Sequence, residues 1–206
     1  MATSGRAGTP KRFADIQRRL RVGTADLHAA VERAVDLPAS VASRQDYVGL
    51  LRRFYDFHSA VEARWASPAW AGSWVGVGIE LDQHRRAHLL AADLVELGEL
   101  TPKARAVRMP ALATWGQGLG SLYVLEGSSL GGRILGPAVR AVLGPVPTGF
   151  FDSAGRQHPS PWRAVSRALV LFEDGGGDGG EALQGARDTF VAFGEHVAHA
   201  GLAGPG

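Results

Sequence analysis

The sequence predicts an all-α fold, arranged as a single-domain helical bundle, and three observations support this. Apolar residues recur at three- and four-residue steps along most of the chain, which is the period of an amphipathic helix. No long stretch alternates apolar and polar residues as a half-buried strand would. The 206 residues are 45% hydrophobic and 20% charged, an ordinary globular composition that excludes wholesale disorder.

The first two expected helices occupy the N-terminal third of the chain. One covers residues 12–35, with a break at 23–24 after which Thr24 caps the second segment. The next begins at Ser43, because Asp46 three residues later can complete a capping box, and it stops before Pro68. Its apolar positions follow helical spacing: Tyr47, Leu50, Leu51, Phe54, Phe57, Val61 and Trp65.

The middle of the chain predicts a loop and two further helices. The Trp- and Gly-rich segment 68–79 is expected to be a loop. A helix over 81–97 follows and ends at Gly98, a suitable C-cap. Another begins near Ala111, meets a glycine-rich run at 127–132 and resumes over 133–143.

The C-terminal part predicts a loop over 144–161, a helix over 161–172, a glycine linker over 175–180 and a last helix over 181–199. A lone terminal helix cannot bury its own apolar face, so it must dock on the body. We therefore expect one domain over residues 11–200, with flexible ends at 1–10 and 201–206.

Composition and charge narrow the function. The chain has no cysteine, which excludes disulfides, thiolate metal sites and cysteine nucleophiles and fits a cytoplasmic protein. The formal net charge is +2 and the basic residues are interleaved with acidic ones, so no nucleic-acid partner is expected. The N-terminus has no signal-peptide core, and charged residues interrupt the least polar stretch, 119–143, so no membrane partner is expected.

Two features point to a binding site. Glycines within a helix cost about 0.5–1 kcal/mol each, yet the run at 127–132 holds three of them, Gly127, Gly131 and Gly132. They indicate a close helix crossing, a loop, or a flat ligand pressed on the backbone. His28 lies beside the apolar stripe of its helix and is either a packed side chain or a ligand. In a cysteine-free all-α protein, histidine is the natural axial ligand of haem.

Other constellations are weaker. Glu80, His84 and His88 share a helical spacing that can hold a metal, but Gln83, Arg85 and Arg86 surround them and favour a solvated face. No Glu-x-x-His di-iron motif and no Gly-x-Ser-x-Gly elbow occurs. The Gly116–Gly120 segment follows no strand and has no phosphate-loop lysine.

Four segments make the sequence resemble the haem oxygenase family, in its bacterial, bacteriophytochrome-associated, biliverdin-forming type. They extend from Leu20 to Phe193 in the family's order: Leu20-Arg21-x-x-Thr24-x-x-Leu27-His28-x-x-x-Glu32, then Leu89-x-Ala91-x-Asp93-Leu94-x-x-Leu97-Gly98, then Tyr123-Val124-Leu125-Glu126-Gly127-Ser128-Ser129-Leu130-Gly131-Gly132, and finally Phe150-Phe151 with Trp162 and Asp188-Thr189-Phe190. The resemblance implies a bundle with a kinked distal helix.

The resemblance also implies residue roles. His28 matches the axial iron ligand, and Glu32 follows it by one turn. Gly127, Gly131 and Gly132 match the distal glycines, while Ser128 stands where animal-type relatives carry an aspartate, so Ser128 or Arg133 is the candidate for organising the distal water. The matching positions for the haem propionates are Arg21, Arg187 and Tyr123.

The implied reaction is oxidative cleavage of haem b, both substrate and cofactor, to biliverdin, CO and Fe²⁺. It consumes O2 and needs an external electron donor, a ferredoxin or flavoprotein reductase, because no flavin or nicotinamide motif is present. A bacteriophytochrome is the implied user of biliverdin. The alternatives are a haem carrier of the same fold, and a related scaffold in which His28 is only packed.

Overall fold

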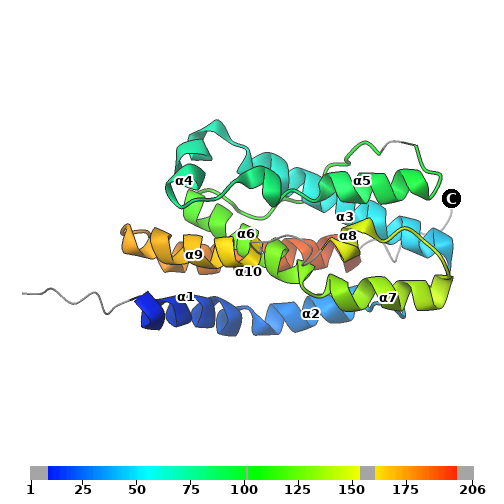
Figure 1. Ribbon diagram of the computed structural model, residues 1–206, viewed down its shortest axis with the longest axis horizontal. Helices are drawn as coiled ribbons and strands as arrows, with labels where there is room; N and C mark the ends of the chain where they lie inside the picture. Colours follow the sequence, from blue (N-terminus) through cyan, green and yellow to red (C-terminus); the bar gives the residue numbers. More distant parts are fainter. Residues whose placement is uncertain (1–8, 101, 154–160, 199–206) are drawn as a thin grey trace, which may run out of the picture.

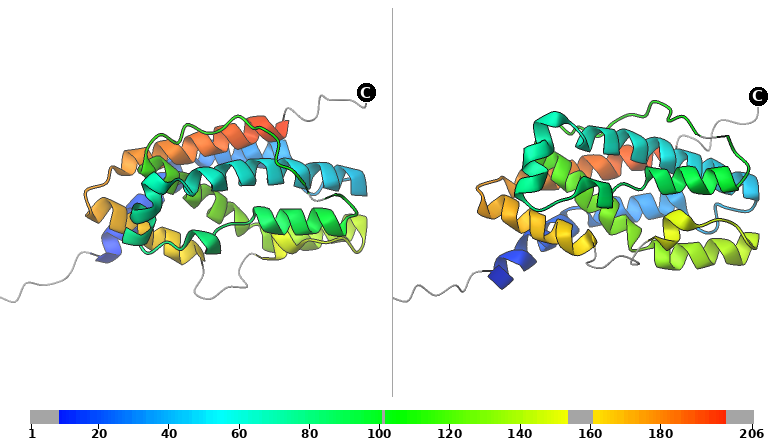
Figure 2. Two further views of the ribbon diagram at one scale, coloured as in Figure 1. Left: turned by 90° about the horizontal axis from the view of Figure 1, so that it is seen from above. Right: turned by 45° about the horizontal axis from the view of Figure 1, so that its top comes forward.

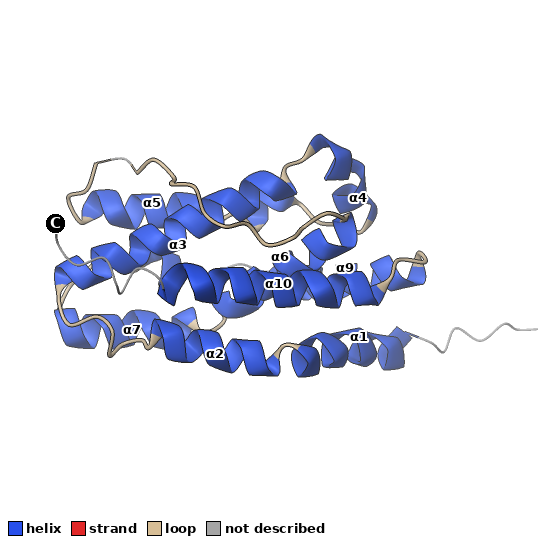
Figure 3. Ribbon diagram, turned by 180° about the vertical axis from the view of Figure 1, so that it is seen from behind, coloured by secondary structure: helices blue, strands red, loops and turns tan. Residues whose placement is uncertain are grey.

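The computed structural model describes residues 9–100, 102–153 and 161–198, and within these ranges the chain is helical with no strand (Figures 1 and 3). The predicted all-α class is confirmed. The expected flexible ends, 1–10 and 201–206, lie almost wholly outside the described residues, as does residue 199, the expected end of the last helix. The helices are α1 (Thr9–Gly23), α2 (Ala25–Val35), α3 (Arg44–Trp65), η1 (Pro68–Trp70), α4 (Ala71–Gly76), η2 (Leu81–Gln83), α5 (Ala87–Glu96), α6 (Trp115–Ser129), α7 (Gly132–Leu143), α8 (Gly149–Asp152), α9 (Pro161–Asp174) and α10 (Gly179–Ala198).

Local sequence signals place several helix ends correctly. Ser43 and Asp46 form the predicted capping box, with Asp46 N donating to Ser43 Oγ at 3.1 Å and Ser43 N donating to Asp46 Oδ2 at 2.8 Å. The break at 23–24 is present, but Thr24 does not cap α2. Its buried hydroxyl donates back to Leu20 O at 2.8 Å instead, so Thr24 closes α1.

Other expected boundaries were wrong. The presumed loop 68–79 holds η1 and α4, because Trp70 and Trp74 bury their rings in the core and fix the backbone around them. The helix expected over 81–97 begins only at Ala87, after η2. The helix expected from Ala111 begins at Trp115, where Thr114 and Gln117 form a second capping box. The loop expected over 144–161 contains α8.

Helices α6 and α10 form the centre of the bundle (Figures 1 and 3). Their backbones touch because glycine stands at both contact positions: a Cβ on Gly120 would overlap Ala182 O, and one on Gly185 would overlap Gln117 O. One apolar cluster surrounds this pair and extends to Trp65 and Trp74. A second cluster lies between α3, α5, α7 and α8, and Phe193 of α10 packs against both.

Helices α2 and α7 run along the same edge of the bundle, the lower edge in Figure 1. The left panel of Figure 2 shows the bundle from above. There α7 (yellow-green) lies toward the lower edge of the picture and α2 (blue) lies further up, while α6 (green) crosses between them and ends where α7 begins. Helix α2 packs chiefly against α10, and α7 against α8. The predicted ligand helix and the predicted glycine-rich turn therefore both lie at the lower edge of the bundle in Figure 1.

The backbone contact at Gly120 yields a stability prediction. We expect Gly120→Ala to lower the free energy of unfolding by about 3 kcal/mol, because its methyl group meets the α10 backbone, which cannot move aside. Gly72→Ala is the matched control, because a Cβ at Gly72 meets nothing within 4 Å and alanine favours the helix by about 0.5–1 kcal/mol. Urea unfolding measures both, and equal stability of the two variants would contradict the close contact.

Candidate functional site

His28 lies on α2 with its imidazole half exposed. The side chain is 52% accessible, and its ring edge packs on Phe190 of α10 with the centroids 5.7 Å apart. Nδ1 lies 3.4 Å from the Glu32 carboxylate one turn later. A carboxylate at one ring nitrogen orients the imidazole and leaves Nε2 as the nitrogen that can bind a metal.

The apolar face of α2 is incompletely covered. No residue of α2 is buried, although Leu27 and Val31 touch the core. Across the same edge of the bundle, Leu130 is 44% and Ile134 75% exposed, in the turn after α6 and on α7. Uncovered apolar side chains on two helices at one edge of a bundle are typical of a site for an apolar ligand.

The three glycines of the turn between α6 and α7 have three different surroundings. A Cβ on Gly132 would overlap the backbone carbonyl of Phe151, so Gly132 lets α7 approach α8. A Cβ on Gly127 would lie 3.1 Å from the Trp162 ring. A Cβ on Gly131 would meet only Ser128 O, at 3.4 Å, so Gly131 leaves bare main chain beside open space. Of the three, Gly131 is therefore the one that can meet a flat ligand.

The polar residues of this turn are exposed or half-buried. Ser128 donates its hydroxyl to Leu125 O at 2.9 Å within its own helix, and Ser129 does the same to Glu126 O at 2.6 Å. The Ser128 oxygen retains lone pairs that can accept a hydrogen bond from a water. Arg133 is exposed on the first turn of α7.

The three predicted propionate residues differ in their freedom. Arg21 is exposed at the end of α1 and lies near Tyr123. Burial raises the pKa of the Tyr123 phenol, and the positive charge of Arg21 partly opposes this rise. The Tyr123 ring lies 5.2 Å from Trp162. Arg187 donates to Gly23 O and lies 3.5 Å from Asp26, so it ties α10 to the junction of α1 and α2.

A buried charged network was missed by the sequence analysis. Glu126, only 3% exposed, accepts a hydrogen bond from Arg86 at 2.9 Å and lies 2.8 Å from His84 Nδ1. The solvated helix face expected at 80–88 is wrong, because His84 and Arg86 are buried and precede α5; Glu80 and His88 are exposed. The sequence did hold a signal for this network. Glu126 lies in the least polar stretch of the chain, 119–143, and a carboxylate buried there requires charged or hydrogen-bonding partners.

Burial raises the pKa of Glu126, but the hydrogen bond from His84 and the charge of Arg86 outweigh burial, so the pKa of this carboxyl lies below its ordinary value. The carboxylate is therefore ionised at neutral pH and can only accept hydrogen bonds, so His84 donates through Nδ1. Among the described residues, no three His, Asp or Glu side chains are grouped to hold a metal ion. None of the described helices is both long and apolar enough to cross a membrane.

Comparison with known proteins gave two matches of interest. The chain is 30% identical over 152 residues to a haem oxygenase from Xanthomonas campestris pv. campestris, covering 71% of this chain and 86% of that protein. Its fold is similar to that of the NO- and CO-bound haem oxygenase from Neisseria meningitidis, with a TM-score of 0.68 and 26% identity over 91% of this chain and 93% of the other. No family model matches the sequence.

The Glu126 network predicts a pH dependence. Because its folded pKa is lowered, ionised Glu126 stabilises the fold above the ordinary carboxyl pKa, and this stabilisation is lost as pH falls through the folded value. We expect Glu126→Gln to cost about 3 kcal/mol at neutral pH by leaving Arg86 without its charged partner. In denaturant unfolding experiments, the difference in free energy of unfolding between Glu126→Gln and the wild type should narrow as the pH is lowered. A difference that stays constant or widens would contradict this assignment.

Proposed function

The chain belongs to the haem oxygenase family, and we propose that it binds haem b between α2 and the turn after α6 and cleaves it to biliverdin, CO and Fe²⁺. The observation that carries this proposal is the half-exposed imidazole of His28 beside an apolar helix face that the chain leaves uncovered. The bare main chain at Gly131 supports the fit of a flat macrocycle on the opposite side. Bound haem supplies an iron that takes electrons and O2, and the porphyrin that is oxidised.

On the α2 side, His28 is the residue to hold the iron through Nε2. The Glu32 carboxylate lies 3.4 Å from Nδ1, where it can orient the ring and leave Nε2 as the nitrogen for the iron. Phe190 supports the ring from α10 and limits its rotation. A neutral imidazole is the type of axial ligand that leaves haem iron reducible and able to bind O2.

On the α6–α7 side, the chain offers backbone and water rather than an acid–base pair. Gly131 allows close approach, and Gly127 and Gly132 fix the two helices that flank the turn. Ser128 is the side chain placed to accept a hydrogen bond from a water above the haem, and Arg133 is the nearby cation on α7. A water that donates to the Ser128 oxygen would be the proton source on this side, because the Ser128 hydroxyl proton is already donated to Leu125 O.

At the edge of the macrocycle, Arg21 and Tyr123 are the partners for the propionates. Arg21 is exposed near the Tyr123 phenol and can turn toward an anion, whereas Tyr123 is buried and would meet the anion where its ring already lies. Arg187 would have to share its guanidinium with Gly23 O and Asp26, so its main contribution is to hold the α1–α2 junction where Arg21 emerges.

Electrons come from a partner protein, a ferredoxin or flavoprotein reductase, and we place the reaction in the cytoplasm, with a bacteriophytochrome as a user of biliverdin. The competing function is a haem carrier on the same scaffold. Haem titration followed by ascorbate separates the two functions, since loss of the Soret band with formation of biliverdin indicates cleavage, and a stable Soret band indicates storage. No change of the haem spectrum on mixing would contradict both.

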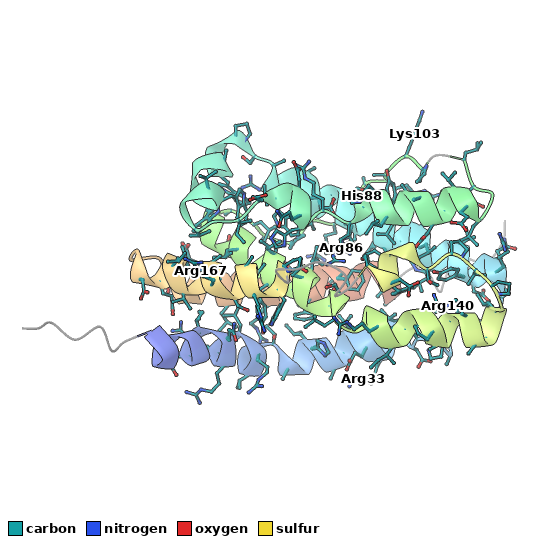
Figure 4. The ribbon with its side chains drawn as sticks, in the orientation of Figure 1. Arg33, Arg86, His88, Lys103, Arg140 and Arg167 are labelled. Atoms are coloured by element: carbon teal, nitrogen blue, oxygen red, sulfur yellow. The ribbon has the colours of Figure 1, made fainter. Side chains whose placement is uncertain are left out.

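His28→Ala tests the axial ligand. We expect at least about ten-fold weaker haem binding, a shifted Soret band and loss of cleavage, with unchanged helical content by circular dichroism. His88→Ala is the control, because His88 is an exposed histidine on α5, well above α2 in Figure 4. Wild-type spectra in His28→Ala would rule out this ligand.

Gly131→Leu tests the opposite side. A leucine there would occupy the open space beside the turn and weaken haem binding by about ten-fold, the equivalent of about 1.4 kcal/mol. Gly76→Leu is the matched control, since a Cβ at Gly76 meets nothing within 4 Å and Gly76 lies on α4. Haem titration of the two variants compares them, and equal affinities would contradict the proposed face.

A further inference from the structure

One buried arginine joins the two sides of the glycine-rich turn. Arg86 donates through Nη2 to Glu126 of α6 at 2.9 Å and through Nη1 to Ser153, just after α8, at 2.7 Å. Its guanidinium lies near the middle of the molecule in Figure 4. Glu126 is the last buried residue of α6, one position before Gly127. The two terminal nitrogens of the guanidinium, its two arms, therefore bind different helix ends: Nη2 binds the end of α6, and Nη1 binds the end of α8.

Helix α8 in turn carries α7. Phe151 packs its backbone on Gly132, and the carboxylate of Asp152 accepts from Arg140 of α7 at 2.9 Å. A shift of α8 would therefore shift the start of α7. Residues 127–131, the end of α6 and the link to α7, are half-buried or exposed, and so are held less firmly than their flanks.

Arg86 is itself fixed to a third helix. Its backbone N–H and that of Ala87 donate to Glu62 Oε1 of α3 at 2.8 and 3.0 Å. Glu62 is buried, so this anchor is shielded from water. The planar guanidinium makes its two hydrogen bonds in a fixed relative direction, which a lysine cannot reproduce with its single nitrogen.

We propose that Arg86 is a positioning residue that sets the angle between α6 and α7, and with it the position of the Gly131 backbone over the bound haem. We name Arg86, Glu126 and Ser153 together the Arg86 bracket. The consequence for haem rests on the proposed function, whereas the mechanical role of the bracket does not. The face that Gly131 presents decides how closely the turn approaches the macrocycle, and so which edge of the ring is left open.

The first test uses the full-length protein without haem. Arg86→Lys keeps the charge and loses one arm, and Ser153→Ala removes only the arm to α8, at a half-buried position. We expect amide hydrogen exchange in residues 127–136 to become at least about ten-fold faster in Arg86→Lys and less so in Ser153→Ala, with α9 unchanged. Wild-type exchange rates over 127–136 in both variants would overturn the bracket.

The control is Arg64→Lys. Arg64 is also partly buried, donates through Nε and Nη2 to Leu112 O at 3.0 and 2.8 Å, and lies over the Trp70 ring, away from the turn. It should leave exchange over 127–136 unchanged. If Arg64→Lys accelerates exchange there as much as Arg86→Lys does, the effect reports general loss of stability and the bracket is overturned.

The second test examines the consequence for haem. We expect Arg86→Lys to bind haem within about three-fold of the wild-type affinity, but to at least double the share of minor biliverdin isomers, a readout that a merely stabilising residue would not move. An unchanged isomer ratio in a variant with faster exchange would overturn the consequence for haem. Failure of the wild type to bind haem would overturn the proposed function while leaving the exchange result to decide the bracket.

Discussion

The direct backbone contact of α6 with α10 is the constraint on which the site is built. Gly120 and Gly185 bring the two main chains together, and every element of the site is attached to one of these two helices. Helix α10 supplies Phe190 beneath the His28 ring and Arg187 at the α1–α2 junction. Helix α6 supplies Tyr123 and the turn with Gly131. The contact thus sets the separation between the two sides of the proposed haem site.

The buried charges at the end of α6 have a different role from the backbone contact between α6 and α10. Burying the Glu126 carboxylate costs desolvation energy, and the hydrogen bonds with Arg86 and His84 offset this energy only in one arrangement of the three side chains. An apolar side chain at position 126 could pack in several ways, whereas an ionised carboxylate between two donors cannot. The network therefore contributes specificity to the end of α6, at the point where the chain turns toward α7.

Local chemistry made much of the fold predictable. The helical period, the capping box at Ser43 and the break after Gly23 depend on neighbouring residues only, and all three are present. The errors fall where tertiary packing decides. Trp70 and Trp74 make helical turns out of an expected loop because their rings are buried. The α-helix expected from Leu81 begins only at Ala87, because His84 and Arg86 turn inward to Glu126.

The candidate site divides in the same way. His28 and the glycine-rich turn were evident from the sequence, since a histidine beside an apolar stripe and three glycines in a helix are both unusual. The separate roles of the glycines were not evident, because Gly132 contacts α8 through a backbone carbonyl that no pattern places there. Nor could spacing alone reveal that Arg187 is engaged by Gly23 O and Asp26.

Helix α2 shows why binding and folding should be coupled in this protein. It has 11 residues, fewer than an isolated helix needs to be stable in water, and none of them is buried. Its stability comes mainly from one side, where it packs against α10. In the proposed complex, a macrocycle covering the other side would bury Leu27 and Val31 further, and iron ligation would add a bond to His28. Part of the free energy of haem binding would then stabilise the folded state of α2, so the helix that carries His28 would be stabilised most by the bound haem.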